Sequence, residues 1–209
     1  MITNYAQIFT CPHCGKNKQV QSLASGNTFG QTVWSDNKVL APMLPRVSLV
    51  QKCPSCGAYY LLSRQKTKYG NDYSSDLSEL SYEEMKEAWS NLKTVDDLTE
   101  NERLAMLMML LWAYNDKYTR YVAIEIPEEE YLFMTGIMNM LLEDDMLESL
   151  LKAELLRESG RFDEAVELLE NCSVESGFMN VFKEKFIELA RCSNVRPFVI
   201  YGPNDNIVD

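Results

Sequence analysis

Apolar residues recur with two different spacings along this chain, and the change between them divides it into two parts. Up to about residue 65, short runs mix β-branched and aromatic residues with polar ones, which is typical of strands. These runs are residues 5–10, 19–23, 28–34, 46–52 and 58–62. Turn-forming residues separate them, notably Ser25-Gly26-Asn27 and the stretch from Pro42 to Pro45. The first part is therefore predicted to be rich in short strands.

Beyond residue 80 the spacing becomes helical, and several helix starts can be recognised. Ser81 with Glu84, and Thr99 with Glu102, fit capping boxes. Pro127 followed by three glutamates fits a third start. The predicted helices cover residues 82–92, 100–116, 128–143, 145–158, 162–172 and 178–192. The last two predicted helices each carry an apolar stripe, and these stripes are predicted to pack together. The stripe of helix 162–172 contains Phe162, Ala165, Val166, Leu169 and Cys172. The stripe of helix 178–192 contains Phe178, Val181, Phe182, Phe186, Leu189 and Ala190.

The two patterns predict an α+β protein with segregated parts. A β-rich domain is expected over residues 1–65 and an all-α domain over 81–209. Between them, residues 66–80 contain a turn-rich run around Gly70, which predicts a linker.

Charge follows the same division. The chain has 209 residues, 46% of them apolar, and a formal net charge of −11. Residues 1–75 carry eight basic and two acidic groups, a formal +6, so the remaining 12 basic and 29 acidic groups give the rest of the chain −17. The longest apolar run, residues 104–113, is shorter than the roughly 18–20 residues needed to span a bilayer, and the N-terminus lacks the pattern of a signal peptide. We expect a cytoplasmic protein without a membrane segment.

The strongest chemical motif is a doubled Cys-Pro-x-Cys-Gly. Cys11 and Cys14 form the first pair, and Cys53 and Cys56 form the second. Two residues between cysteines let both thiolates face one ion, and the glycine after each pair allows the tight turn. Four thiolates complete a tetrahedral shell, for which a single structural Zn²⁺ is the expected ion. The alternative, four unrelated free cysteines, would require the repeated motif to arise by chance.

Around these cysteines the chain resembles the zinc-ribbon family, over roughly residues 7–63. That resemblance implies two knuckles holding zinc between short antiparallel strands, but ribbons serve many functions. Rubredoxins share the cysteine pattern and bind iron for electron transfer. The strands here lack the dense aromatic packing of rubredoxins.

A second resemblance begins at Ala153 and continues through Gly160, Phe162, Ala165 and Leu169. This run is similar to one tetratricopeptide repeat over about residues 145–175, although no copy stands 34 residues earlier, where Ile126 would replace the glycine. An ordinary helical hairpin is the alternative. The combined layout also resembles uncharacterised bacterial proteins, around residues 34–36 and 41–45, and that likeness implies no activity.

Other candidate residues have plain structural explanations. His13, the single histidine, is expected to be a solvent-facing turn residue. The acids at 128–130 and the cluster Glu143, Asp144, Asp145 and Glu148 are expected at helix starts and on solvated faces. Met106, Met108 and Met109, with Met134, Met138 and Met140, are expected in the core rather than in a binding groove. Cys172 and Cys192 are expected to be buried small hydrophobes, too far apart for a disulfide.

No catalytic motif emerges from the sequence, so we expect no enzyme. The leading hypothesis is a zinc-binding adaptor whose helices recognise a protein or peptide, and the acidic surplus of the helical part favours a basic one. The first alternative is a nucleic-acid-associated ribbon protein, although the acidic helical part makes nucleic acid binding by the whole chain unfavourable. An electron carrier or an enzyme with scattered active-site residues is the second alternative.

Overall fold

The structure is a computed structural model of the chain, and it describes residues 2–44, 46–70, 79–95, 97–120, 132–141, 146–173 and 177–202. Its strands are β1 (Ile2–Thr10), β2 (Asn17–Ser25), β3 (Thr32–Trp34), β4 (Val39–Leu40), β5 (Val50–Lys52), β6 (Tyr59–Leu61), β7 (Lys68–Tyr69) and β8 (Val199–Tyr201). Its α-helices are α1 (Tyr82–Leu92), α2 (Glu100–Tyr118), α3 (Leu132–Met138), α4 (Met146–Glu158), α5 (Phe162–Asn171) and α6 (Gly177–Arg191). The predicted α+β class is confirmed.

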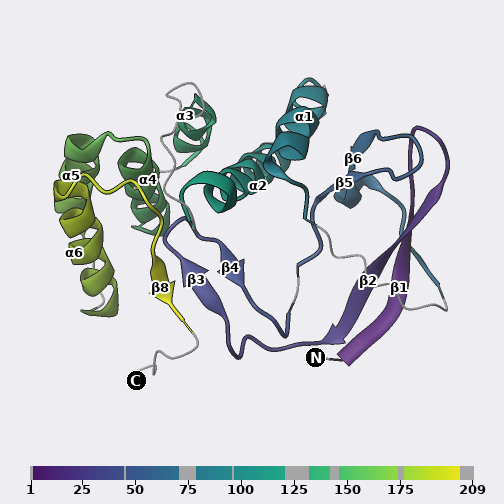
Figure 1. Cartoon of the computed structure of the whole chain (residues 1–209), viewed down its shortest axis with the longest axis horizontal. Coiled ribbons are helices and arrows are strands. Elements are labelled where there is room, and N and C mark those ends of the chain that lie inside the picture. The colour runs from purple at the N-terminus through teal and green to yellow at the C-terminus, as the bar shows by residue number, and fades with distance from the viewer. Residues whose placement is uncertain are drawn as a thin grey trace. The chain divides into compact units, whose positions relative to one another are not determined.

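The chain folds into two compact units that do not follow its sequence order. The first unit includes residues 1–31 and 40–113, and the second includes residues 32–39 and 114–202. One boundary therefore falls inside helix α2, and the second unit takes a short segment from the strand-rich part of the chain (Figure 1). Most of the predicted linker, residues 71–78, lies outside the described residues.

The first unit contains two separate antiparallel sheets. Strands β1 and β2 form a long hairpin, and β7 pairs with the other edge of β1 (Figure 1). Strands β5 and β6 form a second, short hairpin in which Val50 lies opposite Leu61 and Lys52 opposite Tyr59. All three residues of β6 are buried, because this strand lies against helix α1.

Both helices of the first unit begin as their sequences predict. The Ser81 hydroxyl accepts a hydrogen bond from the Glu84 N–H at 3.3 Å, and the Glu84 carboxylate accepts one from the Ser81 N–H at 3.1 Å. Thr99 and Glu102 make the same reciprocal pair at 3.2 and 3.1 Å. Each box satisfies two backbone donors that a helix start leaves free. The start predicted at Pro127 lies outside the described residues.

Polar bonds tie these helices to the strands. The Lys52 ammonium donates to Glu84 at 3.0 Å and the Tyr59 hydroxyl donates to Glu87 at 2.7 Å, so β5 and β6 are both held to α1. The Arg64 guanidinium donates from Nε and Nη2 to the two carboxylate oxygens of Glu102, at 3.0 and 2.6 Å. This bidentate pair lowers the pKa of Glu102 to about 2.

The second unit is built around the hairpin of α4 and α5. Gly160 joins these helices with φ of +77°, a left-handed conformation that favours glycine after a helix end. Leu150 and Ala153 of α4 are buried together with Leu169 of α5 and Phe186 of α6. The two predicted stripes do meet here through Leu169 and Phe186. Val181, however, is 62% exposed, so the predicted α6 stripe is wrong at that position.

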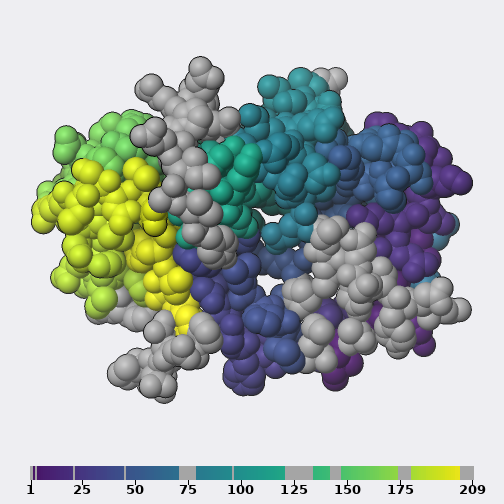
Figure 2. All heavy atoms as spheres, in the orientation of Figure 1, coloured from purple at the N-terminus to yellow at the C-terminus, as the bar shows by residue number. Residues whose placement is uncertain are grey.

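The C-terminal segment completes the second unit. Strand β8 pairs antiparallel with β3, and Figure 2 shows the yellow C-terminal residues lying against the green atoms of the preceding helices. Ser35 exchanges two hydrogen bonds with Phe198, one from its own N–H and one to its hydroxyl, both at 2.9 Å. The Phe198 ring lies edge-on to Phe186, with centroids 5.1 Å apart. This strand was not predicted, because Val199–Tyr201 is short and follows a proline-containing turn.

A network of buried charged groups fills the centre of the second unit. The Arg120 guanidinium donates to Asp36 and, at 2.6 Å from Nε, to Asp116. Its guanidinium carbon also lies 4.3 Å from the centroid of the Trp34 ring. The Lys38 ammonium pairs with Asp116 as well. The loop after β3 is thereby fixed to the end of α2 by ion pairs that are largely withdrawn from water.

Arg157 connects the same unit to its C-terminal segment. Its guanidinium donates twice to Glu154, at 2.6 and 2.7 Å, and donates to the backbone carbonyls of Asn194 and Arg196. Arg157 and Glu154 are both fully buried. A buried ion pair is stable only when its remaining donors find partners, and the two carbonyls supply them.

Glu158 is the member of this network with the least compensation. The Asn115 amide donates to Glu158 Oε2 and to Asp36 Oδ2, each at 2.9 Å, whereas Glu158 Oε1 is buried with no hydrogen-bond partner among the described residues. Burial, with the nearby carboxylates of Glu154 and Asp36, raises the pKa of Glu158 well above its usual range, against the opposing effect of Arg157. Four carboxyls, of Asp36, Asp116, Glu154 and Glu158, meet three cations, of Lys38, Arg120 and Arg157. Protonation of Glu158 makes the net charge of these seven groups zero.

This charge balance predicts how stability depends on pH. In the unfolded chain Glu158 titrates near 4.3, and in the folded chain its pKa is higher, so its contribution is complete below about pH 4.3 and is lost as pH rises through the folded value. Glu158→Gln replaces the protonated carboxyl by a neutral isostere. We compare the unfolding free energy of the variant with that of the parent at each pH. The difference should shift in favour of the variant by about 1–3 kcal/mol between pH 5 and pH 9, the range for an uncompensated buried polar group.

Urea unfolding followed by circular dichroism at pH 5, 7 and 9 measures the effect. Glu184→Gln, on the exposed face of α6, is the control and should show no pH-dependent difference from the parent. A Glu158→Gln variant that is less stable than the parent by the same amount at all three pH values would contradict the assignment of the proton.

Candidate metal centre

The two cysteine pairs lie on two turns with the same backbone hydrogen bonds. In the first turn the Cys11 N–H donates to Lys16 O at 2.8 Å and the Gly15 N–H donates to Cys11 O at 3.0 Å. In the second, the Cys53 N–H donates to Ala58 O and the Gly57 N–H to Cys53 O, both at 2.9 Å. The turns follow β1 and β5, so each is held by its own hairpin.

Each glycine in the motif is required by its backbone conformation. Gly15 has φ of +71° and Gly57 has φ of +74°, in the left-handed region that other residues rarely adopt. A hydrogen-bonded turn that reverses within four residues needs this conformation after the second cysteine. The spacing Cys-x-x-Cys-Gly is thus the sequence of one particular turn, used twice.

The four sulfur atoms converge on one point. Their ligand atoms all lie within 4.8 Å of one another, and this is the group of potential metal ligands found in the described part of the chain. The sulfurs of Cys11 and Cys56 are 3.8 Å apart, and those of Cys14 and Cys53 are 3.6 Å apart. Four thiolates at about 2.3 Å from a tetrahedral Zn²⁺ would be separated by about 3.8 Å. The cluster therefore has dimensions that fit such an ion.

The thiols of this cluster are electrostatically coupled. Hydrogen bonding from the backbone N–H of Cys56 lowers the pKa of Cys53 to about 6, which favours the Cys53 thiolate at neutral pH. The N–H of Ala58 favours the Cys56 thiolate, but burial and the neighbouring sulfurs outweigh it and raise the pKa of Cys56 to about 12. Without a cation, Cys53 ionises readily and Cys56 resists ionisation. A bound divalent ion removes that resistance.

One side of the cluster is apolar and the other faces solvent. Cys11 and Cys53 are buried against Tyr60, with Leu62 packed beside them, while Cys14 and Cys56 are exposed. Burial, together with the four nearby cysteines, raises the pKa of Tyr60 to about 12. The Tyr60 hydroxyl is buried without a hydrogen-bond partner among the described residues. The site is thus backed by a small core of its own.

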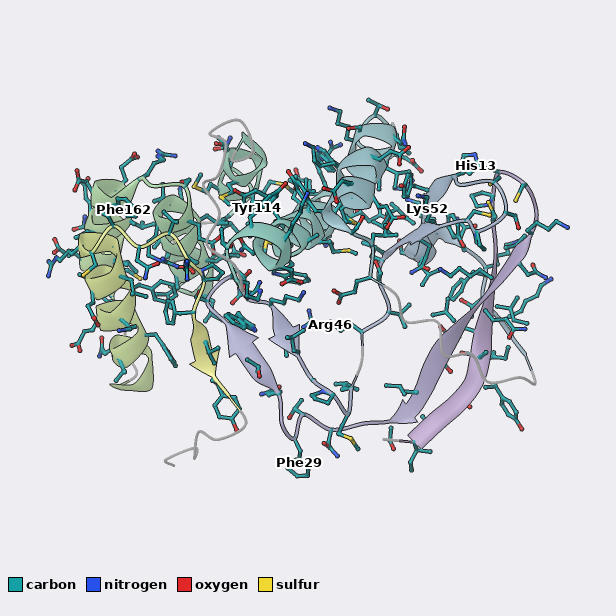
Figure 3. The ribbon with its side chains drawn as sticks, viewed as in Figure 1. His13, Phe29, Arg46, Lys52, Tyr114 and Phe162 are labelled. Atoms are coloured by element: carbon teal, nitrogen blue, oxygen red, sulfur yellow. The ribbon has the colours of Figure 1, made fainter. Side chains whose placement is uncertain are left out.

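His13 takes no part in the sulfur cluster. It is exposed on the first turn, as predicted, and Figure 3 shows it at the outer end of the strand-rich region. Of the predicted acidic cluster, Glu143, Asp144 and Asp145 lie outside the described residues, and Glu148 lies half-buried in the first turn of α4.

Two predictions about sulfur-containing residues need revision. Cys192 is exposed and Cys172 is half-buried, so their description as buried hydrophobes is wrong for Cys192; the α6 helix ends before it, and its side chain leaves the apolar stripe. Met106 is fully buried, as predicted. Met108, Met134 and Met138 are buried as well, whereas Met109 is only half-buried; Met109 and Met108 both line a cavity of about 430 Å³ in the first unit.

No protein family model, no curated protein and no solved structure matches this chain. The cysteine geometry is consequently the main structural guide to its function. Among the described residues, no helix is both long enough and apolar enough to cross a membrane.

The sequence did not indicate the buried charge network of the second unit. Asp36, Arg120 and Glu158 stand far apart in the chain, and the resemblance around residues 34–36 gave Asp36 no role. One sequence signal was available, since Glu154 and Glu158 are four residues apart in α4 and share a helix face with Leu151 and Leu155, where acidic side chains are rare.

The metal content is directly measurable. We expect purified protein to contain about one zinc per chain, because the sulfur cluster offers one closed tetrahedral shell. Cys53→Ser removes a ligand whose pKa is lowered, and should lower zinc content by more than half and destabilise the strands, while most of the helical circular dichroism signal remains.

Cys192→Ser is the matched control, since it changes an exposed thiol outside the cluster. Elemental analysis and circular dichroism of both variants and the parent test the prediction. Protein without metal, or red protein containing iron, would contradict it.

Proposed function

We propose that this chain is a non-enzymatic adaptor in which a structural zinc ion stabilises the strand-rich turns and the helical hairpin binds a protein or peptide. The observation that supports a structural zinc ion is the shell of four cysteine sulfurs. A catalytic zinc usually has three protein ligands and one open position for water or substrate. Four converging thiols leave no such position, and they are the ligand set typical of zinc that supports a fold.

The surroundings of the cluster support a structural role. His13, the single histidine of the chain, is exposed and is not among the residues that converge on the metal position. The nearest buried polar side chain, Tyr60, has a raised pKa and remains protonated at neutral pH. Neither residue is placed to act as a general base at the sulfur cluster. Paired cysteines that bind zinc are also typical of reducing compartments, so we place the protein in the cytoplasm.

The helical part contributes the proposed binding surface. A hollow of about 560 Å³ lies in the second unit and is lined by residues of α3, α4 and α5, among them Met138, Leu156 and Leu168. Most of its lining is polar, with Lys152, Arg161, Glu164 and Glu167 as its charged groups. Hollows between packed helices are a common place for peptides to bind.

Charge favours a basic or mixed-charge partner. Residues 76–209 carry 29 acidic and 12 basic groups, so the potential around the helices is negative. Within the hollow, Arg161 is neutralised by Glu164, to which it donates at 2.7 and 2.5 Å. Glu167 is exposed on the same wall, and it is the acid that we expect a cationic side chain to meet.

A charge reversal in the hollow tests this role. Glu167→Lys combined with Asn171→Lys should change unfolding free energy by about 0.5 kcal/mol or less for each substitution, because both side chains are exposed. The variant should lose most of the proteins that the parent captures from an extract of its host. Glu184→Lys, an exposed acid on α6 outside this hollow, is the control and should capture the same set. Identical captured sets for all three proteins would contradict a binding role for this hollow.

Nucleic acid binding is the competing function, and the basic charge of residues 1–75 favours it. The formal +6 falls to about +4 when four thiolates and one Zn²⁺ are included, and the rest of the chain carries −17. We expect no binding tighter than about 1 µM to duplex DNA or RNA at physiological salt. Fluorescence anisotropy measures it. Salt-sensitive submicromolar binding would make nucleic acid the preferred partner.

A further inference from the structure

The first unit contains an apolar cavity that the metal centre does not use. Its volume is about 430 Å³, within the range of small-molecule sites, roughly 300–1,000 Å³. The lining comes from the segment after β4, from the residues that precede and begin α1, and from α2. The apolar side chains that line it include Leu49, Leu80, Met85, Leu104, Met109 and Trp112.

The character of this lining favours a flexible apolar ligand. Met85, Met108 and Met109 all reach the cavity. Methionine side chains are unbranched and polarisable, so they adapt to ligands of irregular or mobile shape. Met85 and Met108 are almost fully buried, at 1% and 8% exposure, and they form the floor, while Met109 is partly exposed. An aliphatic chain matches this wall better than a rigid, hydrogen-bonding molecule does.

A positively charged side chain lies at the rim of the cavity. Arg46 is exposed, and its guanidinium carbon lies 5.6 Å from the ring centroid of Trp112, which also lines the cavity. Figure 3 marks Arg46 on the segment between β4 and β5. No carboxylate among the described residues forms an ion pair with it. The stacked ring orients the guanidinium while leaving its N–H groups available to a ligand anion.

From this combination we infer that the cavity is a binding site for an aliphatic monocarboxylate, whose chain lies among the methionines and whose carboxylate accepts hydrogen bonds from Arg46. This inference goes beyond the proposed adaptor function and does not depend on it. A guanidinium binds a carboxylate through two parallel hydrogen bonds, which gives a preference for this head group over a hydroxyl. Glu79 also lines the cavity, so an aliphatic ammonium is the competing ligand.

The test compares three probes that share one chain and differ in the head group: decanoate, decanol and decylamine. Calorimetric titration of the full-length protein at pH 7 should give a dissociation constant on the order of 10–100 µM for decanoate, a range set by typical ligand efficiencies. Decanol should bind about tenfold more weakly, because it lacks the ionic hydrogen bonds, and decylamine more weakly still. Quenching or enhancement of tryptophan fluorescence should accompany binding in the parent and disappear in Trp112→Phe, while calorimetry still detects decanoate.

Variants assign the head-group contact. Arg46→Gln should weaken decanoate binding about tenfold and leave decanol unchanged, and Arg46→Lys should restore part of the difference. Arg103→Gln is the matched control, because it removes the same charge from α2 at a residue that does not line the cavity. Thermal unfolding of each variant confirms that it is folded.

Three outcomes would overturn the inference. Absence of decanoate binding up to about 1 mM would remove the site. Equal affinities for decanoate and decanol, or tighter binding of decylamine, would show that the carboxylate is not the recognised group. Decanoate binding that is unchanged in Arg46→Gln would place the ligand elsewhere on the protein.

Discussion

The convergence of four cysteine sulfurs is the constraint on which the strand-rich part depends. Cys11 and Cys14 follow β1, whereas Cys53 and Cys56 lie between β5 and β6, so the cluster joins two hairpins that share no ladder. Without a shared cation, four thiolates within 4.8 Å would repel one another, and four neutral thiols would offer weak hydrogen bonds at most. A bound ion would therefore replace the hydrophobic core that the three-residue strands β5 and β6 cannot build alone. It would close a loop between Cys14 and Cys53 that contains β2, β3, β4 and β5.

In the second unit, buried charged groups connect segments that are distant in sequence. Asp36 comes from the loop after β3, Arg120 lies just beyond the end of α2, and Arg157 comes from α4. Ion pairs join Arg120 to Asp36 and Arg157 to Glu154, and the Asn115 amide links Asp36 to Glu158. Replacing such a network by apolar side chains often costs nothing, so its presence is weak evidence for stability. Its geometry instead defines one arrangement of the chain. At position 157, only an arginine can donate hydrogen bonds to Glu154 and to two backbone carbonyls together.

Local sequence predicted what depends on local interactions. Helix α1 begins and ends at the predicted residues, because its capping box lies entirely within Ser81–Glu84. The cysteine cluster was predicted for the same reason, since each knuckle is a turn of a few residues, and only the meeting of the two knuckles is a long-range event. Strands β7 and β8 were missed, because two or three residues form a strand only when a distant edge is available to pair with. The acid count alone could not reveal that Glu158 is buried, because its hydrogen-bond donor, Asn115, lies 43 positions away in sequence.

The C-terminal segment limits how far the resemblance to tetratricopeptide repeats can be carried. In a repeat array, each helix pair leaves an apolar face that the next pair covers, and the array ends where a different element takes that place. Here Phe198 and Ile200 pack against the cluster of Leu150, Ala153, Leu169 and Phe186. Arg157 holds the segment that leads to them through the carbonyls of Asn194 and Arg196. Because this face is already covered within the chain, a stacked array cannot continue from it. A peptide partner would therefore meet the hollow formed by α3, α4 and α5 rather than a long superhelical groove, which favours a short recognition segment over an extended one.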